Sequence, residues 1–244
     1  MKPFFSRIAF TLGALVVIGC SAGIARADGI VFLGPDPCFP AGVGRGCGID
    51  RAVHVLSTQS QGASSTEIAS VGRNANGDVK TGDWLRGSNT QTVSLTDIGF
   101  TNSASDIRIY FDISEPLGGA RAPVTLNSLV LTAYDSSGHA VFSASLITVP
   151  ETFVMNGNGQ GTSDYVFALD AAAAARLQAV IAANPDLRLG ISANITDAQG
   201  GPESFFIGTA PAAVPEPATM LLLGTGLAGV AAGIRRRRKT EQNR

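Results

Sequence analysis

Residues of the kinds that carry enzyme chemistry are scarce in this chain, whose 244 residues include two His, three Cys and one Trp. Neither His54 nor His139 belongs to a set of ligands at a recognised metal-binding spacing. The sequence also lacks a Gly-x-Ser-x-Gly nucleophile elbow and a phosphate-binding glycine loop. We therefore expect a protein that is not an enzyme and that holds neither a metal nor another cofactor.

Charged residues are few as well, at 15% of the chain, and they are unevenly distributed. Half of the 18 Lys and Arg residues lie before Asp28 or after Val214. The body between these positions keeps nine basic and 17 acidic residues, a net charge of −8. This balance argues against nucleic acid or an anionic membrane surface as a partner of the body.

The N-terminus has the features of a secretory signal peptide. Lys2 and Arg7 supply the positive charge that such peptides carry before their apolar stretch. Residues 8–19 form that stretch, which is too short for a comfortable transmembrane helix. The alternative is a buried N-terminal helix.

An Ala-x-Ala site follows the apolar stretch. Ala25 and Ala27 are its small residues, so we expect signal peptidase to cleave before Asp28, which makes residues 1–27 the signal peptide. A competing cleavage site lies before Cys20. The preceding Val-Ile-Gly is similar to the lipoprotein box, in which the cysteine is lipidated. A lipid there would duplicate the membrane attachment that the other end of the chain provides.

The C-terminus contains the second long apolar segment, residues 218–234, which carries no charge and is just long enough to span a bilayer as a helix. A basic cluster follows it and is made of Arg235, Arg236, Arg237, Arg238 and Lys239. By the positive-inside rule, this cluster and the rest of residues 235–244 stay in the cytoplasm, which places the body outside.

Val214, Pro215, Glu216 and Pro217 precede this segment. The two prolines favour an extended backbone, which a processing peptidase can bind. The motif, the apolar helix and the Arg-rich end occur in that order and resemble the PEP-CTERM sorting signal. The alternative is an ordinary tail-anchored protein in which Pro-Glu-Pro occurs by chance.

The resemblance implies recognition by an exosortase, a membrane-embedded peptidase, through Pro215, Glu216 and Pro217. It also implies a Gram-negative-type bacterium that makes extracellular polysaccharide. The chain would pass through an inner-membrane intermediate and then reach the cell surface or the medium. Because the resemblance stops near residue 213, it does not extend to the activity of the body.

The body, residues 28–210, has the composition of one all-β domain, with a Pro-rich linker at 211–217. We expect a mostly antiparallel β-sandwich of jelly-roll or immunoglobulin-like type. Strands are predicted at 52–56, 91–95, 106–113, 126–134, 140–147, 152–155, 165–169, 187–195 and 203–207. No strand is predicted in the Gly-rich segments 28–50 and 71–90.

One helix is predicted at 171–183, with Asp170 as its N-cap and Asn184-Pro185 as its end. Its apolar stripe should lie on the sheet and consists of Leu177, Val180 and Ile181. The residues 135–139 predict a tight hairpin turn between two strands.

Cys38 and Cys47 are the two cysteines of the body and lie in its irregular first segment. In an oxidising compartment we expect a disulfide between them. By the loop-entropy model a ring this short contributes about 2–3 kcal/mol to stability.

Three features leave functional alternatives open. Trp84 is expected to be at least half-buried, with exposure on a sugar-binding face as the alternative. The turn at 74–78 suggests calcium, although it lacks the spacing of an EF-hand loop. A glycosidase would need a carboxylate pair, and the candidate pairs are Asp112 with Glu115 and Glu151 with Asp164.

The leading expectation is therefore a non-catalytic extracellular matrix or biofilm component with extracellular polysaccharide as its candidate ligand. The alternatives are a secreted polysaccharide hydrolase and a calcium-dependent adhesion module. A β-sandwich can serve all three functions, so the fold alone does not decide between them.

Overall fold

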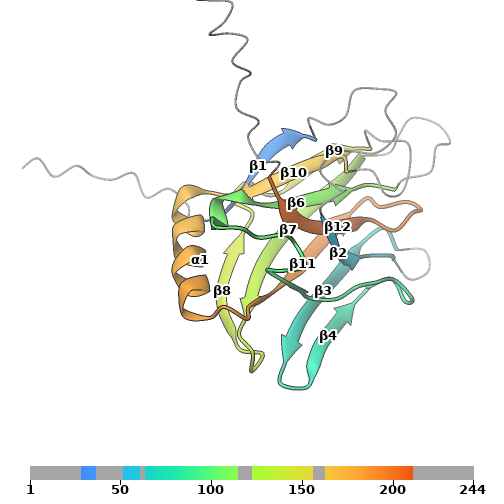
Figure 1. Cartoon of the computed structure of the whole chain (residues 1–244). Helices are drawn as coiled ribbons and strands as arrows, with labels where there is room; N and C mark the ends of the chain where they lie inside the picture. Colours follow the sequence, from blue (N-terminus) through green and yellow to red (C-terminus); the bar gives the residue numbers. More distant parts are fainter. Residues whose placement is uncertain (1–28, 37–51, 61–63, 115–122, 156–162, 211–244) are drawn as a thin grey trace, which may run out of the picture.

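The computed structural model describes residues 29–36, 52–60, 64–114, 123–155 and 163–210, which form a sandwich of two antiparallel sheets (Figure 1). The mostly antiparallel β-sandwich is thus confirmed. The expected signal peptide, Cys20, the two cysteines of the body and the C-terminal segment lie outside the described residues. Within those residues, no helix has the length and apolar character needed to span a membrane.

The first sheet has five strands in the order β1-β10-β6-β12-β2. Their bounds are β1 Ile30–Pro35, β2 Val53–Ser57, β6 Ile107–Asp112, β10 Tyr165–Leu169 and β12 Ser204–Thr209. Strands far apart in sequence are neighbours here, so the sheet depends on long-range pairing.

The second sheet has seven strands. Its main order is β4-β3-β11-β7-β8, with β5 also paired to β11 and β9 to β7. Their bounds are β3 Glu67–Asn74, β4 Gly77–Gly82, β5 Val93–Ser94, β7 Pro123–Tyr134, β8 Ala140–Ser145, β9 Glu151–Val154 and β11 Arg188–Thr196. The tight turn predicted at 135–139 connects β7 to β8, with Gly138 at a positive φ of 81°.

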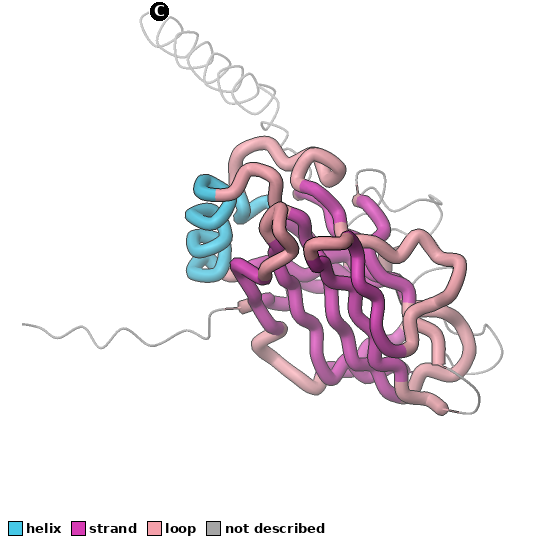
Figure 2. The backbone as a smooth tube through the Cα atoms, turned by 90° about the horizontal axis from the view of Figure 1, so that it is seen from below, coloured by secondary structure: helices cyan, strands magenta, loops and turns pink. Residues whose placement is uncertain are grey.

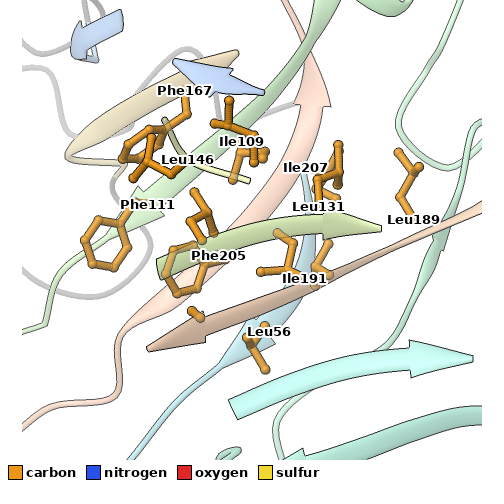
Figure 3. Close-up of a cluster of buried hydrophobic side chains, with 14 of the residues drawn as sticks. Leu56, Ile109, Phe111, Leu131, Leu146, Phe167, Leu189, Ile191, Phe205 and Ile207 are labelled. Atoms are coloured by element: carbon orange, nitrogen blue, oxygen red, sulfur yellow. The ribbon is translucent and has the colours of Figure 1, made fainter. Parts of the chain in front are cut away.

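The core lies between the sheets and follows from the alternation of apolar residues along the strands. In β6 and just after it, Ile107, Ile109, Phe111 and Ile113 all point inward and are at most 1% exposed. Figure 3 shows how side chains from both sheets meet in this layer. Phe111 stacks on Phe205 of β12 with ring centroids 4.7 Å apart and planes at 9°.

Helix α1, Ala171–Ala183, has the predicted bounds and the predicted cap, because the Asp170 carboxylate accepts a hydrogen bond of 2.8 Å from the Ala173 amide. Leu177 is fully buried. The helix packs against β8, β10 and the short 3₁₀ helix η2, Ala104–Asp106. It therefore closes one side of the sandwich rather than lying across a sheet face, as Figures 1 and 2 show.

Two segments that were assigned no strand do contain strands. β1 lies in 28–50, and the hairpin of β3 and β4 occupies much of 71–90. β1 is short, and its register against β10 shifts between Phe32 and Gly34. In the hairpin, Asn74 Oδ1 accepts the Asn76 amide at 2.8 Å and Gly77 has a φ of 123°, so the predicted turn forms and its flanking residues pair.

The first and last described residues lie at the same end of the five-stranded sheet. β1 begins opposite Leu169, where β10 ends, and β12 ends at Thr209 opposite Ile107, where β6 begins. The segment that precedes Gly29 and the segment that follows Ala210 are therefore both attached at this end.

Candidate functional site

The predicted sorting motif begins four positions after Ala210, the last described residue. The Ala210 amide donates a hydrogen bond of 2.6 Å to the Asp106 carbonyl, so the sandwich holds the chain up to this residue. The motif, the basic cluster, the signal-cleavage residues Ala25, Ala27 and Asp28, and the pair Cys38 and Cys47 lie outside the described residues. These site predictions stay predictions.

The described carboxylates among those proposed for a glycosidase site lie in or beside strands of both sheets. Asp164 is fully buried and its Oδ2 accepts the Ile113 amide at 2.8 Å. Glu151 belongs to β9 of the other sheet, opposite Leu126, where burial raises the pKa of its carboxyl. No described hydrogen bond joins the two. Asp112 is 2% exposed on β6, and its proposed partner Glu115 lies outside the described residues.

A histidine and two serines form a hydrogen-bonded chain on the outer face of the five-stranded sheet. The Ser57 Oγ lies 2.7 Å from His54 Nε2 and 2.7 Å from Ser204 Oγ. A nucleophile and its base lie at such distances in hydrolases. However, Ser57 is only 4% exposed, and no carboxylate among the described residues bonds to His54. We interpret this chain as a structural link between β2 and β12.

His54 should make the stability of the protein depend on pH. Burial lowers its pKa below the ordinary value of 6.5, an effect that the Asn89 carbonyl partly opposes. Below about pH 6.5 the unfolded chain therefore binds a proton that the folded chain does not. We expect the free energy of unfolding to fall as the pH falls through this value and to level off below the lowered pKa.

The test is denaturant unfolding of the wild type and His54→Gln across this pH range. The difference between their free energies of unfolding should be constant above about pH 6.5, where it reflects lost contacts of His54, and should change with pH only below that value. His139→Gln is the matched control, since the His139 side chain is 80% exposed in the hairpin turn. A His54→Gln variant that keeps the wild-type pH dependence would contradict the burial of this imidazole.

A polar pocket of about 390 Å³ lies between the described residues of 59–60 and 64–67 on one side and the 198–201 loop on the other. Its lining consists of Gln59, Ser60, Ser64, Ser65, Glu67, Ala198, Gln199, Gly200 and Gly201. Glu67 is 1% exposed, and its carboxylate accepts hydrogen bonds from the Thr58 hydroxyl and the Ser60 amide. The pocket can offer hydrogen bonds, but its one carboxylate is already bonded to two donors of the protein.

Trp84 is partly buried and packs against the core, with Lys80 Nζ 4.8 Å from its ring centroid. This confirms the expected burial and gives no support to an exposed sugar-binding role for it. The turn at 74–78 uses its oxygens within the protein, since Asp78 Oδ2 accepts the Thr92 amide at 3.1 Å. Among the described residues, no group of three His, Cys, Asp or Glu side chains is arranged to hold a metal ion.

The structure also shows a feature that the sequence reasoning missed. The ring of Tyr134, at the end of β7, lies over two glycines of neighbouring strands, Gly190 of β11 and Gly72 of β3. A Cβ atom at Gly72 would be 2.6 Å from the Tyr134 hydroxyl oxygen. The signal in the sequence is a glycine at an outward position in each of two strands.

Comparison with known proteins identifies the tail alone. Residues 213–238 match the model of the PEP-CTERM protein-sorting motif. No curated protein and no solved structure matches the chain. The C-terminus of this chain is therefore a PEP-CTERM sorting motif, which marks an exported protein that an exosortase processes and that reaches the cell surface through the membrane.

Proposed function

We propose that the body is a non-catalytic component of the extracellular matrix or biofilm, with extracellular polysaccharide as its ligand. The sorting motif at residues 213–238 carries this proposal, because it directs the chain to the surface. The host is a Gram-negative-type bacterium, and the chain passes through an intermediate in its inner membrane.

Two properties of the folded body support this function. Both of its ends leave from the same end of the five-stranded sheet, so a folded body can be held at the membrane by either terminal segment. Its net charge of −8 also favours release from an anionic membrane surface once the tail is cut.

A non-catalytic role agrees with how two of the buried carboxylates are used. Asp164 accepts a backbone amide and Glu67 accepts a hydroxyl and a backbone amide. Incubation of the protein with the extracellular polysaccharide of the producing strain should release no new reducing ends. A release that Asp112→Asn or Asp164→Asn abolishes in a folded protein would contradict the proposal and favour a hydrolase.

The intact mass of the protein recovered outside the cell tests the sorting part of the proposal. In a host with its exosortase, we expect a chain that begins at Asp28 and ends near Val214, with any added mass indicating a covalent attachment. Without the exosortase this species should be absent. A full-length C-terminus bound to the membrane in both hosts would contradict the proposal and leave an ordinary tail-anchored protein.

A further inference from the structure

The outer face of the seven-stranded sheet presents hydroxyl and amide side chains in regular rows. Strand pairing aligns one row across five strands, formed by Thr81, Ser70, Ser192, Val130 and Ser145. The neighbouring rows are Ile68, Asn194 and Ser128, and Thr196, Thr125 and Thr152. All of these side chains are partly or fully exposed. Val130 and Ile68 are apolar, and the other members carry a hydroxyl or an amide. Since paired strands lie about 4.8 Å apart, the rows form a regular, mostly polar grid.

This grid contains no charged side chain, although the body as a whole is acidic. At the β4 edge, Asp83 adjoins the grid, since its Oδ2 accepts the Ile68 amide at 3.0 Å. Along β11, the nearest described charged residues are Arg188 at one end and Asp197 beyond the other. Both are bonded within the protein: Arg188 Nε donates to Thr92 Oγ1 at 2.8 Å, and Asp197 Oδ2 accepts from Thr125 Oγ1 at 2.9 Å. The surface between them is uncharged, and some of its hydroxyls bond one another, Ser70 to Thr81 at 2.6 Å and Thr125 to Thr152 at 3.3 Å.

Tyr134 adds an aromatic surface to one end of the grid. Its ring extends from β7 over Gly190, where a Cβ would lie 3.2 Å from Cε2, to Gly72 on β3. Glycine weakens a strand, and in strands it often marks a place where another group approaches the backbone closely. Gly72 lets the ring lie against the sheet, whereas a Cβ at Gly190 would meet the Val71 carbonyl oxygen at 2.3 Å as well as the ring. Tyr134 stays partly exposed.

We propose that this face, the Tyr134 ring together with the polar rows, binds a strand of neutral polysaccharide. An aromatic ring can stack on the apolar C–H face of a sugar, and hydroxyl and amide groups can bond its hydroxyls. Along the five-strand row, a chain that crosses the strands meets a hydroxyl on every strand except β7, where Val130 lies, with neighbouring strands about 4.8 Å apart. Neutral chains are favoured because the grid carries no cation and the acidic body repels anionic polymers.

This inference rests on the proposed function for its ligand class and adds the site and the neutral charge of the polymer. The test measures retention of the protein on insoluble cellulose, curdlan and cross-linked dextran. Alginate is the acidic comparison. The test uses both the released protein and the full-length chain in detergent, so a failure of sorting does not affect the outcome. We expect retention on at least one neutral glucan, with little dependence on salt.

Tyr134→Ala should weaken that retention by about tenfold, whereas Tyr134→Phe should leave it within about twofold. Gly72→Val should reproduce the loss, since its side chain displaces the ring. The matched control is Leu33→Ala, a residue 55% exposed at the edge of the other sheet, which should bind as the wild type does. Circular dichroism verifies that each variant is folded.

Several results would overturn the inference. One is a folded Tyr134→Ala variant that is retained as strongly as the wild type. The others are a wild type that no neutral glucan retains, and a wild type that only alginate retains. A dimer in solution that Tyr134→Ala converts to a monomer would also overturn it, because this face would then bind a second copy of the chain. The outcome of the intact-mass experiment on sorting does not depend on any of these four results.

Discussion

A triple variant should stay full-length and membrane-bound in a host that has its exosortase. It combines Pro215→Ala, Glu216→Gln and Pro217→Ala. The two prolines keep the segment extended, which is the form that a peptidase binds. Glu216 is the only acidic residue between Glu203 and Glu241, so its removal takes the only negative charge from this part of the tail. We expect the released fraction to fall by about tenfold or more, a loss equivalent to about 1.4 kcal/mol or more of recognition.

The measurement is the intact mass and amount of the protein in the membrane and extracellular fractions. The fold should be unaffected, since the changes lie outside the described residues of the sandwich, which end at Ala210. Pro211→Ala is a matched control, because it changes a proline of the same linker outside the motif. Normal release of the triple variant would show that the motif is not what the peptidase recognises, and loss of release in Pro211→Ala would implicate the whole linker.

The elements that the sequence predicted well are those whose signals are local. In β6 the strict alternation of Ile107, Ile109 and Phe111 with polar or aromatic residues identifies the strand and its inner face. Helix α1 has both its cap and its stop in the sequence, and its bounds were predicted correctly. The hairpin turn at 135–139 likewise depends on adjacent residues.

The strands that were missed have weak local signals. In β3, Ala69 and Val71 are buried, but the outward positions hold Ser70 and Gly72, so the segment is too polar to stand out. β4 lies at the edge of its sheet and has only one apolar residue, Val79. Edge strands need little burial, and their sequences therefore resemble loops.

The candidate binding face could not be predicted for a different reason. It requires Tyr134 of β7 to lie near Gly190 of β11 and Gly72 of β3, and these three positions are brought together only by strand order and register. Periodicity shows which residues share a face of one strand, but it does not show which strands are neighbours. The link between His54, Ser57 and Ser204 depends on β2–β12 pairing in the same way.

Two adjacent phenylalanines of β12 should differ strongly in their contribution to stability. Phe205 is fully buried and stacks on Phe111, whereas Phe206 points to the outer face and is only partly buried beside His54. Phe205→Ala should lower the free energy of unfolding by about 3–5 kcal/mol. This is a large part of the total of about 5–15 kcal/mol that a domain commonly has. Urea denaturation of the two single variants measures the difference.

Phe206→Ala is the matched control, with an expected cost of about 1–2 kcal/mol because less of its area is buried. The double variant Phe111→Ala with Phe205→Ala should lose less free energy of unfolding than the two single variants lose together. The difference should be about 1 kcal/mol, because the two rings contact each other. A shift of β12 by one residue would exchange the inward and outward positions of Phe205 and Phe206. Equal costs, or a larger cost for Phe206→Ala, would therefore contradict the register of β12 against β6, and with it the placement of Ser204 beside Ser57.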